Sequence, residues 1–151
     1  VQHGNNRKVW INLTDAFPHP YTREDAMYWI ESCIENDGPQ QNFAIVAEDR
    51  AVGGIGVHPR SDVHRGTAII GYWLGEAVWG RGIATEACGL MTEYAFKAFD
   101  VRKLLATVFS WNPASARVLT KNGYAFEARL RGNIVKDGRV CDELIYGRLK
   151  C

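Results

Sequence analysis

The stretch from Ile69 to Phe99 constrains the fold of this chain more than any other part of the sequence. It reads IIGYWLGEAVWGRGIATEACGLMTEYAFKAF, in which an apolar run leads through a glycine-rich bend into an amphipathic pattern. This pattern predicts a strand, a bend and a helix of about Ile83 to Phe99. A helix N-terminus presents unpaired N–H groups and a positive dipole end, and Gly80 and Gly82 let a bulky anion approach the backbone. The bend therefore predicts a pyrophosphate-binding site.

Three kinds of phosphate-binding loop have to be compared with this bend. A nucleoside-triphosphate loop needs G-x-x-x-x-G-K-[ST], and the chain contains no Gly-Lys-Ser/Thr. A dinucleotide fingerprint needs an acidic group at the far end of the next strand, whereas Asp100 precedes that strand. The coenzyme A loop of acyltransferases, [Q/R]-x-x-G-x-[G/A], is matched by Gly82 and Ala84 in its last two places. Its first place is Trp79, which departs from the pattern, and Arg81 supplies a cation nearby.

Length and composition narrow the class of protein. The chain has 151 residues and 46% hydrophobic content, which predicts one domain over residues 1–151 with a sizeable core. A formal net charge of +1, without a basic run, gives no reason to expect a nucleic-acid partner. Apolar stretches fall short of the ~20 residues of a membrane span, and no signal-peptide pattern opens the chain. We expect no membrane partner and a cytoplasmic location.

The four cysteines do not predict a metal site or a disulfide framework. Cys33, Cys88, Cys141 and Cys151 lie far apart, and no cluster of histidines completes a zinc site. We therefore expect free thiols and no metal. Cys88, on the helix after the bend, is expected to be a small core residue.

The rest of the chain divides into helices and strands. Thr22 is a predicted N-cap, and Asn112 followed by Pro113 is typical of a helix start that ends at Asn122-Gly123. The predicted helices are Thr22–Asn36, Ile83–Phe99 and the one that follows Asn112, and the predicted strands are Asn42–Glu48, Ala51–His58, Thr67–Leu74, Val101–Phe109, Tyr124–Arg131 and Arg139–Leu149. The apolar face of the second helix is expected to contain Ile83, Ala87, Leu90, Met91, Tyr94 and Ala98. This order implies an α/β fold, a mixed sheet with helices on its faces.

Four segments give the chain a resemblance to a known family. They are Phe17 to Ala26 (FPHPYTREDA), Gly71 to Ala87 (GYWLGEAVWGRGIATEA), Asn112 to Leu119 (NPASARVL) and Lys121 to Tyr124 (KNGY). In this order they resemble the GCN5-related N-acetyltransferases, particularly the branch of the ribosomal-protein N-terminal acetyltransferases. The resemblance implies the acyl-CoA N-acyltransferase fold, with a central, twisted, mostly antiparallel sheet flanked by helices.

The beginning of the chain departs from the resembled fold, which opens with a strand and a helix. Val1 to Lys8 contains no start methionine and no strand pattern. A missing N-terminal strand would leave backbone groups unpaired at one sheet edge, where a partner chain can satisfy them. We therefore expect a homodimer.

The resemblance assigns cofactor contacts to the strand, the bend and the next helix. Backbone groups of the strand are expected to bond the pantetheine arm and to polarise the thioester carbonyl, while the bend holds the pyrophosphate. The expected contacts of acetyl-CoA are Tyr72, Trp73, Leu74, Val78, Trp79, Gly80, Arg81, Gly82, Ile83, Ala84, Thr85, Asn112 and Ser115.

Amide formation also needs a proton for the departing thiolate and a base for the amine. The family places an N-x-x-S pair beside the thioester sulfur, so Ser115 is the predicted proton donor, and Tyr146 is a further catalytic candidate. Positions where some relatives carry a catalytic glutamate are apolar here: Ala68 to Ile70, and Ile134. A water chain that ends near Glu76, His58 or Asp142 is the remaining route.

The acceptor side is assigned to an aromatic segment and a histidine. Phe17 and Tyr21 belong to a segment that resembles the wall of the substrate site, and His58 titrates near neutral pH. The sequence thus predicts an N-acetyltransferase that transfers acetyl from acetyl-CoA to a primary amine, by direct attack in a ternary complex. The acceptor is a protein N-terminus or a small-molecule amine. The alternative is a non-catalytic acyl-CoA-binding or regulatory module with the same fold.

Overall fold

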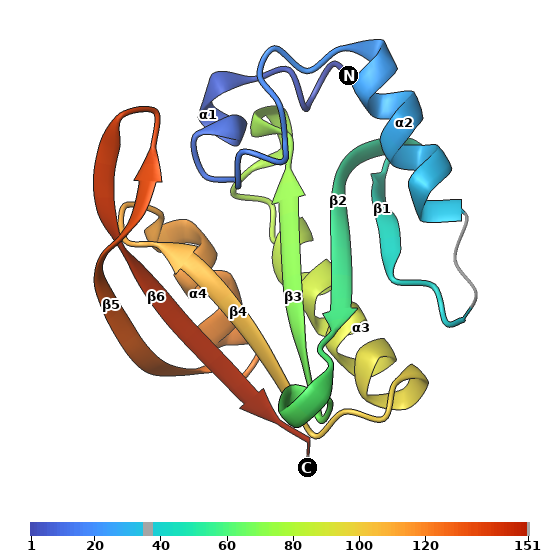
Figure 1. The fold of residues 1–151 in the computed structure, drawn as a ribbon. Coiled ribbons are helices and arrows are strands. Elements are labelled where there is room, and N and C mark those ends of the chain that lie inside the picture. The colour runs from blue at the N-terminus through green and yellow to red at the C-terminus, as the bar shows by residue number, and fades with distance from the viewer. Residues whose placement is uncertain (35–37, 151) are drawn as a thin grey trace.

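A six-stranded mixed sheet in the order β1-β2-β3-β4-β6-β5 forms the centre of the protein (Figure 1). The computed structural model describes residues 1–34 and 38–150. The strands are β1 (Asn42–Ala47), β2 (Arg50–Pro59), β3 (Thr67–Leu74), β4 (Lys103–Phe109), β5 (Ala125–Lys136) and β6 (Arg139–Leu149). The helices are α1 (Arg7–Trp10), α2 (Arg23–Ile34), α3 (Ile83–Ala98) and α4 (Pro113–Lys121), with short 3-10 turns η1 (Asp62–His64) and η2 (Glu76–Val78).

Strands β3 and β4 diverge in the middle of the sheet. They form the one parallel pair among the described strands, and their pairing extends only from Thr67 with Lys103 to Ile69 with Leu105. Beyond Ile69, β3 is paired with β2 on one side and has no strand partner on the other. The two strands therefore open into a V toward their C-terminal ends, as Figure 1 shows.

The predicted helix boundaries follow from local side-chain bonds. Thr22 and Asp25 form a reciprocal capping box, in which the Asp25 N–H donates to Thr22 Oγ1 at 3.2 Å and the Thr22 N–H donates to Asp25 Oδ2 at 2.8 Å. The Asn112 side chain accepts from the Ser115 N–H at 3.2 Å and caps α4. Asn36, the predicted end of the first helix, lies outside the described residues.

Two sequence predictions were wrong in detail: the buried face of α3 and the end of strand β5. The buried stripe of α3 consists of Cys88, Met91, Thr92 and Ala95, whereas Leu90 is 64% exposed. Strand β5 continues to Lys136 because a bulge between Leu130 and Ile134, with Gly132 at φ 61°, interrupts its pattern without ending the pairing. The N-terminal segment, for which no element was predicted, contains helix α1.

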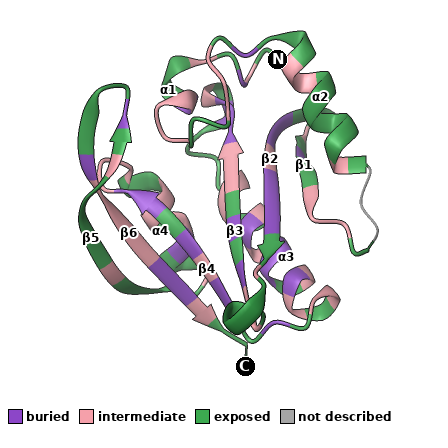
Figure 2. Cartoon of the chain, in the orientation of Figure 1, coloured by how far each residue is buried: buried purple, intermediate pink, exposed green. Residues whose placement is uncertain are grey.

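The hydrophobic core lies between the sheet and helices α3 and α4. Val57, Ala68, Leu104 and Leu119 are completely or almost completely buried there, and Figure 2 shows the same concentration of buried residues along β2, β3 and β4. Helix α2 differs, since none of its residues is buried. None of the described helices has the length and apolar character that a bilayer span requires.

Strand β1 forms an edge of the described sheet. Its one described partner is β2, and Val46 on β1 is 61% exposed. An open edge of this kind is what the sequence-based expectation of a homodimer needs, and dimerisation stays a prediction.

Candidate active site

The glycine-rich bend leaves open space in front of the N-terminus of α3. Gly80 and Gly82 have φ values of 76° and 82°, a left-handed conformation that side chains other than glycine rarely adopt. A Cβ atom at either position would meet nothing within 4 Å. Gly82 is the N-cap residue of α3, and no side chain of the described residues caps this helix end. The N-terminal amides of α3 therefore face a space that fits a bulky anion such as a pyrophosphate.

The two side chains that flank Gly80 have partners. Arg81 forms an exposed ion pair with Glu48, with a nitrogen–oxygen distance of 2.6 Å. Exposed pairs of this kind contribute little stability, so little free energy is needed to separate the guanidinium from Glu48. Trp79 donates from Nε1 to the Leu74 carbonyl at 2.7 Å, which fixes the indole against the end of β3.

The open edge of β3 continues from the bend into the V. On the side of β4, the β3 residues beyond Ile69 have no partner among the described strands. Backbone N–H and C=O groups on this side are therefore available to an extended, amide-containing ligand such as a pantetheine arm, which takes the place of a neighbouring strand. This arrangement suits the backbone role predicted for Tyr72, Trp73 and Leu74.

A pair of hydroxyl groups joins β3 to α4 across the V. The Tyr72 hydroxyl lies 2.9 Å from Ser115 Oγ and donates to the Ser115 carbonyl oxygen at 3.1 Å. Burial raises the pKa of the Tyr72 phenol, and the hydrogen bond with Ser115 offsets only part of this increase. Tyr72 therefore keeps its proton at neutral pH and is available as a donor next to the predicted catalytic hydroxyl.

Sequence reasoning assigned Tyr72 a backbone role and missed its side chain. The two hydroxyl groups are 43 positions apart in the chain, and only the V-shaped opening brings them together. Tyr146, the other predicted catalytic residue, lies in the core opposite Ala106 and edge-on to Phe126, with ring centroids 5.7 Å apart. Among the described residues, no hydrogen bond connects Tyr146 with Ser115 or Tyr72.

The predicted acceptor residues do not all lie together. Phe17 stacks on Tyr21 with ring centroids 4.6 Å apart and meets the edge of Trp73 at 5.4 Å. These three rings form one aromatic group at the C-terminal end of β3. His58 is opposite Ile69 in the register of β2 and β3, four residues along the strand from Trp73, or about 13 Å. The structure therefore unites Phe17 with Tyr21 and places His58 apart.

Glu76, Asp142 and His58, the three candidates for the outer end of a water chain, differ in how readily they accept a proton. Hydrogen bonds from Lys8 and Asn6 lower the pKa of Glu76, and bonds from the Gly132 N–H and Arg129 lower the pKa of Asp142. Both carboxylates are thus stabilised as anions and are weak bases. Desolvation lowers the pKa of His58, so its imidazole is neutral at pH 7 and able to accept a proton.

A cavity of about 320 Å³ lies across the open end of the V. Its wall is formed by Lys8, Ile11, Asn12, Trp79, Trp111 and Arg139. Trp79 is fixed to the end of β3, and Trp111 packs edge-on against Phe109, the last residue of β4, with centroids 5.8 Å apart. Sequence analysis missed Trp111 and Arg139 because neither belongs to a motif. A larger hollow of about 590 Å³, between the C-terminal part of α4 and the β5–β6 pair, has no lining residue in common with the predicted site.

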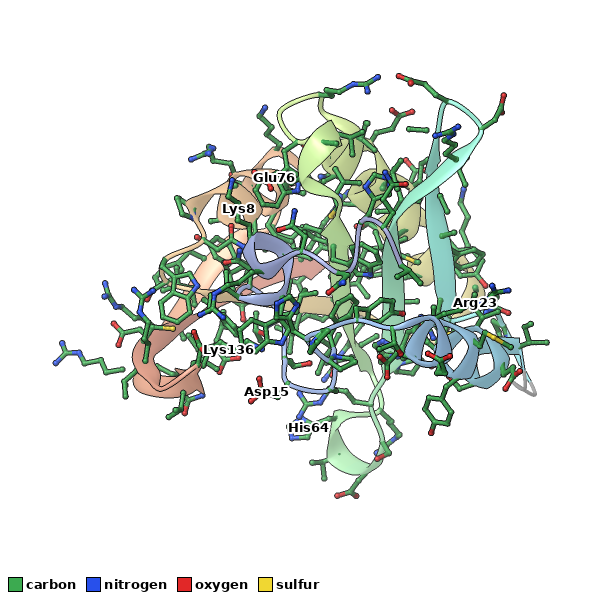
Figure 3. The ribbon with its side chains drawn as sticks, turned by 90° about the horizontal axis from the view of Figure 1, so that it is seen from above. Lys8, Asp15, Arg23, His64, Glu76 and Lys136 are labelled. Carbon is green, nitrogen blue, oxygen red and sulfur yellow. The ribbon has the colours of Figure 1, made fainter. Side chains whose placement is uncertain are left out.

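Ion pairs connect the N-terminal segment to both sides of this cavity. Lys8 pairs with Glu76 beside the bend, and Arg7 pairs with Asp137 at the tip of the β5–β6 hairpin. Lys136, whose side chain is 2% exposed, pairs with Asp15 at 2.6 Å. Figure 3, viewed from above, shows Lys8 near Glu76 and Lys136 beside Asp15. Within the described residues, no group of three or more histidines, cysteines or acidic residues is placed to hold a metal ion.

Comparisons with known proteins agree with this arrangement. Residues 3–125 match the family described as "Acetyltransferase (GNAT) domain". The chain is 34% identical over 99 residues to the uncharacterised N-acetyltransferase YoaA of Bacillus subtilis, a match that covers 66% of this chain and 55% of YoaA. It is 25% identical over 145 residues to the ribosomal-protein-serine acetyltransferase of Escherichia coli, covering 94% of this chain and 80% of that protein.

The fold is also that of solved acetyltransferases. The structure of RimL, a ribosomal L7/L12 alpha-N-protein acetyltransferase in complex with coenzyme A, superposes with a TM-score of 0.82 at 24% identity, covering 98% of this chain and 85% of that chain. The chain spans between 55% and 65% of the length of the first curated relatives it matches.

Proposed function

Because the chain belongs to the GNAT acetyltransferase family, we propose that it transfers an acetyl group from acetyl-CoA to a primary amine. The observation that carries the proposal is the continuity of three features: an uncapped helix N-terminus behind two left-handed glycines, an open strand edge, and a protonated hydroxyl pair. The helix N-terminus suits the pyrophosphate of acetyl-CoA, the open strand edge suits its pantetheine arm, and the hydroxyl pair suits its sulfur. The RimL structure, which contains coenzyme A, supports the choice of this cofactor.

Each group at the site has a defined task in this reaction. The N-terminal amides of α3, with Arg81, hold the pyrophosphate. A backbone N–H on the open edge of β3 donates to the thioester carbonyl and stabilises the negative charge that develops on its oxygen. As the amine nitrogen bonds to the carbonyl carbon, the carbon–sulfur bond breaks. Ser115, backed by Tyr72, gives a proton to the sulfur, and the amine loses one proton to water.

The relay through two hydroxyl groups has a geometric basis. Either oxygen of the 2.9 Å contact can be the donor. When the single Tyr72 proton turns from the Ser115 carbonyl to Ser115 Oγ, the serine proton is free to move to the sulfur, and the phenol proton replaces it. The proton that the amine released to water then returns to the phenolate. Asn112, a predicted acetyl-CoA contact, also holds the backbone of Ser115 in place, since its side chain caps the first turn of α4.

Calorimetry and turnover measurements test this proposal together. We expect acetyl-CoA to bind, and a panel of peptide and small-molecule amines to show release of free thiol. Ser115→Ala is expected to lose turnover and keep binding, because the hydroxyl acts only when the thiolate departs. A well-folded chain that does not bind acetyl-CoA would contradict the proposal.

A non-catalytic acyl-CoA-binding module is the second candidate function. It is favoured by the carboxylates of Glu76 and Asp142, which cations and amides hold as anions, and by the apolar residues from Ala68 to Ile70. Binding of coenzyme A without thiol release on any amine of the panel would support this alternative.

A further inference from the structure

The cavity at the open end of the V has an unbalanced charge. Its six lining residues include two cations, Lys8 and Arg139, and no acidic residue. Glu76 neutralises Lys8. Arg139, at the start of β6, forms no ion pair with any carboxylate of residues 1–34 or 38–150. One positive charge in the wall is therefore available to a ligand.

Arg139 is held in a defined position. Its guanidinium carbon lies 4.9 Å from the centroid of the Trp111 ring. A guanidinium over an indole is stabilised by the ring and still presents its N–H groups at the edge, where a carboxylate can accept two of them. Arg129, from the same strand pair, differs because its Nε donates to Asp142 at 2.5 Å.

The two indoles of the cavity wall also differ. Trp79 donates its Nε1 proton to the Leu74 carbonyl. The Nε1 atom of Trp111 is buried, and no described protein group accepts a hydrogen bond from it. A buried donor without an acceptor is destabilising, so an anion that reaches Trp111 gains a hydrogen bond for which no described protein group competes.

From these observations we propose that the acceptor carries a carboxylate in addition to its amine, and that Arg139 and the Trp111 indole N–H bind this carboxylate. The inference rests on the proposed function, because the amine of a molecule in this cavity has to reach a thioester held along the open edge of β3. The volume of about 320 Å³ is at the lower end for small-molecule sites, and suits one or two amino-acid residues. A free amino acid and the N-terminus of an acidic peptide share this chemistry.

Two matched pairs of acceptors test the proposal and separate the two sources. Phenylalanine is compared with phenethylamine, which lacks the carboxylate, and the tripeptide amide Ser-Glu-Ala with Ser-Gln-Ala. The expected result is a kcat/KM at least about tenfold higher for the member with the additional carboxylate in one pair, and a preference that shrinks with added salt. The pair that shows the preference identifies the source. Equal kcat/KM values in both pairs would overturn the inference while acetylation itself remains.

Variants assign the preference to the two side chains. Arg139→Gln is expected to bring the ratio within a pair close to one, while Arg139→Lys keeps part of it. Trp111→Phe retains the aromatic ring, removes the N–H and is expected to reduce the ratio severalfold. Arg102→Gln is the matched control, since Arg102 is exposed and lies at the opposite end of β4. An unchanged ratio in Arg139→Gln would overturn the inference.

Direct binding keeps this test independent of turnover. The charged and neutral tripeptide amides are titrated calorimetrically into the chain in the presence of coenzyme A. We expect the dissociation constant of the charged peptide to be at least about tenfold lower, and Arg139→Gln to remove the difference. If no amine is acetylated, the proposed function fails, and equal dissociation constants would then also reject the carboxylate site.

Discussion

The hydroxyl pair between β3 and α4 makes the sharpest prediction about catalysis. Tyr72→Phe keeps the ring in the core and removes the hydroxyl that lies 2.9 Å from Ser115 Oγ. A single hydrogen bond contributes about 0.5–1.5 kcal/mol net, so the loss of unfolding free energy is expected to be about 1 kcal/mol. Loss of a proton donor costs far more in rate, about 10²-fold or about 2.7 kcal/mol of activation free energy.

Turnover, binding and stability are measured on the same set of variants. Thiol release gives kcat, calorimetry gives coenzyme A affinity, and urea unfolding gives stability. Tyr72→Phe and Ser115→Ala are each expected to lower kcat strongly with little change in affinity. Because the two hydroxyl groups act as one relay, the double variant is expected to be hardly slower than either single variant.

Tyr124 provides a matched control for this experiment. Its hydroxyl also lies 2.9 Å from a hydroxyl partner, Thr92 Oγ1, and burial raises its pKa to about 12. This pair joins the residue before β5 to α3 instead of crossing the V, so Tyr124→Phe is expected to lose similar stability and to keep its turnover. A Tyr72→Phe variant with kcat within about threefold of the parent, or a Tyr124→Phe variant that is equally slow, would refute the relay.

Three further predictions concern the bend, the core and the N-terminal segment. Gly82→Ala and Gly138→Ala place a Cβ at φ values of 82° and 69°, where it meets no described atom within 4 Å. Both variants are therefore expected to lose about 1–2 kcal/mol of unfolding free energy through backbone strain alone. In calorimetry, only Gly82→Ala is expected to bind coenzyme A more weakly. Burial raises the pKa of Cys88 from 9.0 to about 11, so the folded state holds this proton more tightly than the unfolded state. As the pH rises from 9 to 11, the unfolding free energy is therefore expected to fall by about 3 kcal/mol. In urea titrations over this pH range, the unfolding free energy of Cys88→Ala should fall less steeply. Asp15→Asn leaves the buried Lys136 ammonium without its carboxylate and is expected to cost about 1–3 kcal/mol, whereas Lys136→Met, which removes the buried charge, should cost less in thermal unfolding.

The parts of the site that the sequence predicted are those encoded by neighbouring residues. The bend needs Gly80 and Gly82 for their backbone conformation, and the capping of α4 needs Asn112 three positions before Ser115. Both features are local, so a short motif specifies them. The same holds for the capping box at Thr22, where the two partners are three residues apart.

The parts that were missed depend on contacts between distant segments. Helical spacing predicted Leu90 in the core because it is apolar, but the buried stripe of α3 runs through Cys88, Met91 and Ala95, and Leu90 is 64% exposed. The bond between Tyr72 and Ser115 depends on how far β3 and β4 diverge, which no local pattern records. Trp111 and Arg139 become neighbours only when the β5–β6 hairpin folds over the end of β4.

The two sides of the proposed site therefore differ in how strongly the sequence constrains them. We propose that the pyrophosphate of coenzyme A binds at one continuous bend, where a change at Gly82 strains the backbone. The cavity wall combines α1, the bend, the end of β4 and the start of β6. Three ion pairs join the N-terminal segment to Glu76 and to the β5–β6 hairpin. Because Lys8 is neutralised by Glu76 and Arg139 has no described acidic partner, one substitution at Arg139 changes the net charge of this wall. We therefore expect a substitution at Arg139 to change the choice of acceptor while coenzyme A binding at Gly80 and Gly82 stays the same.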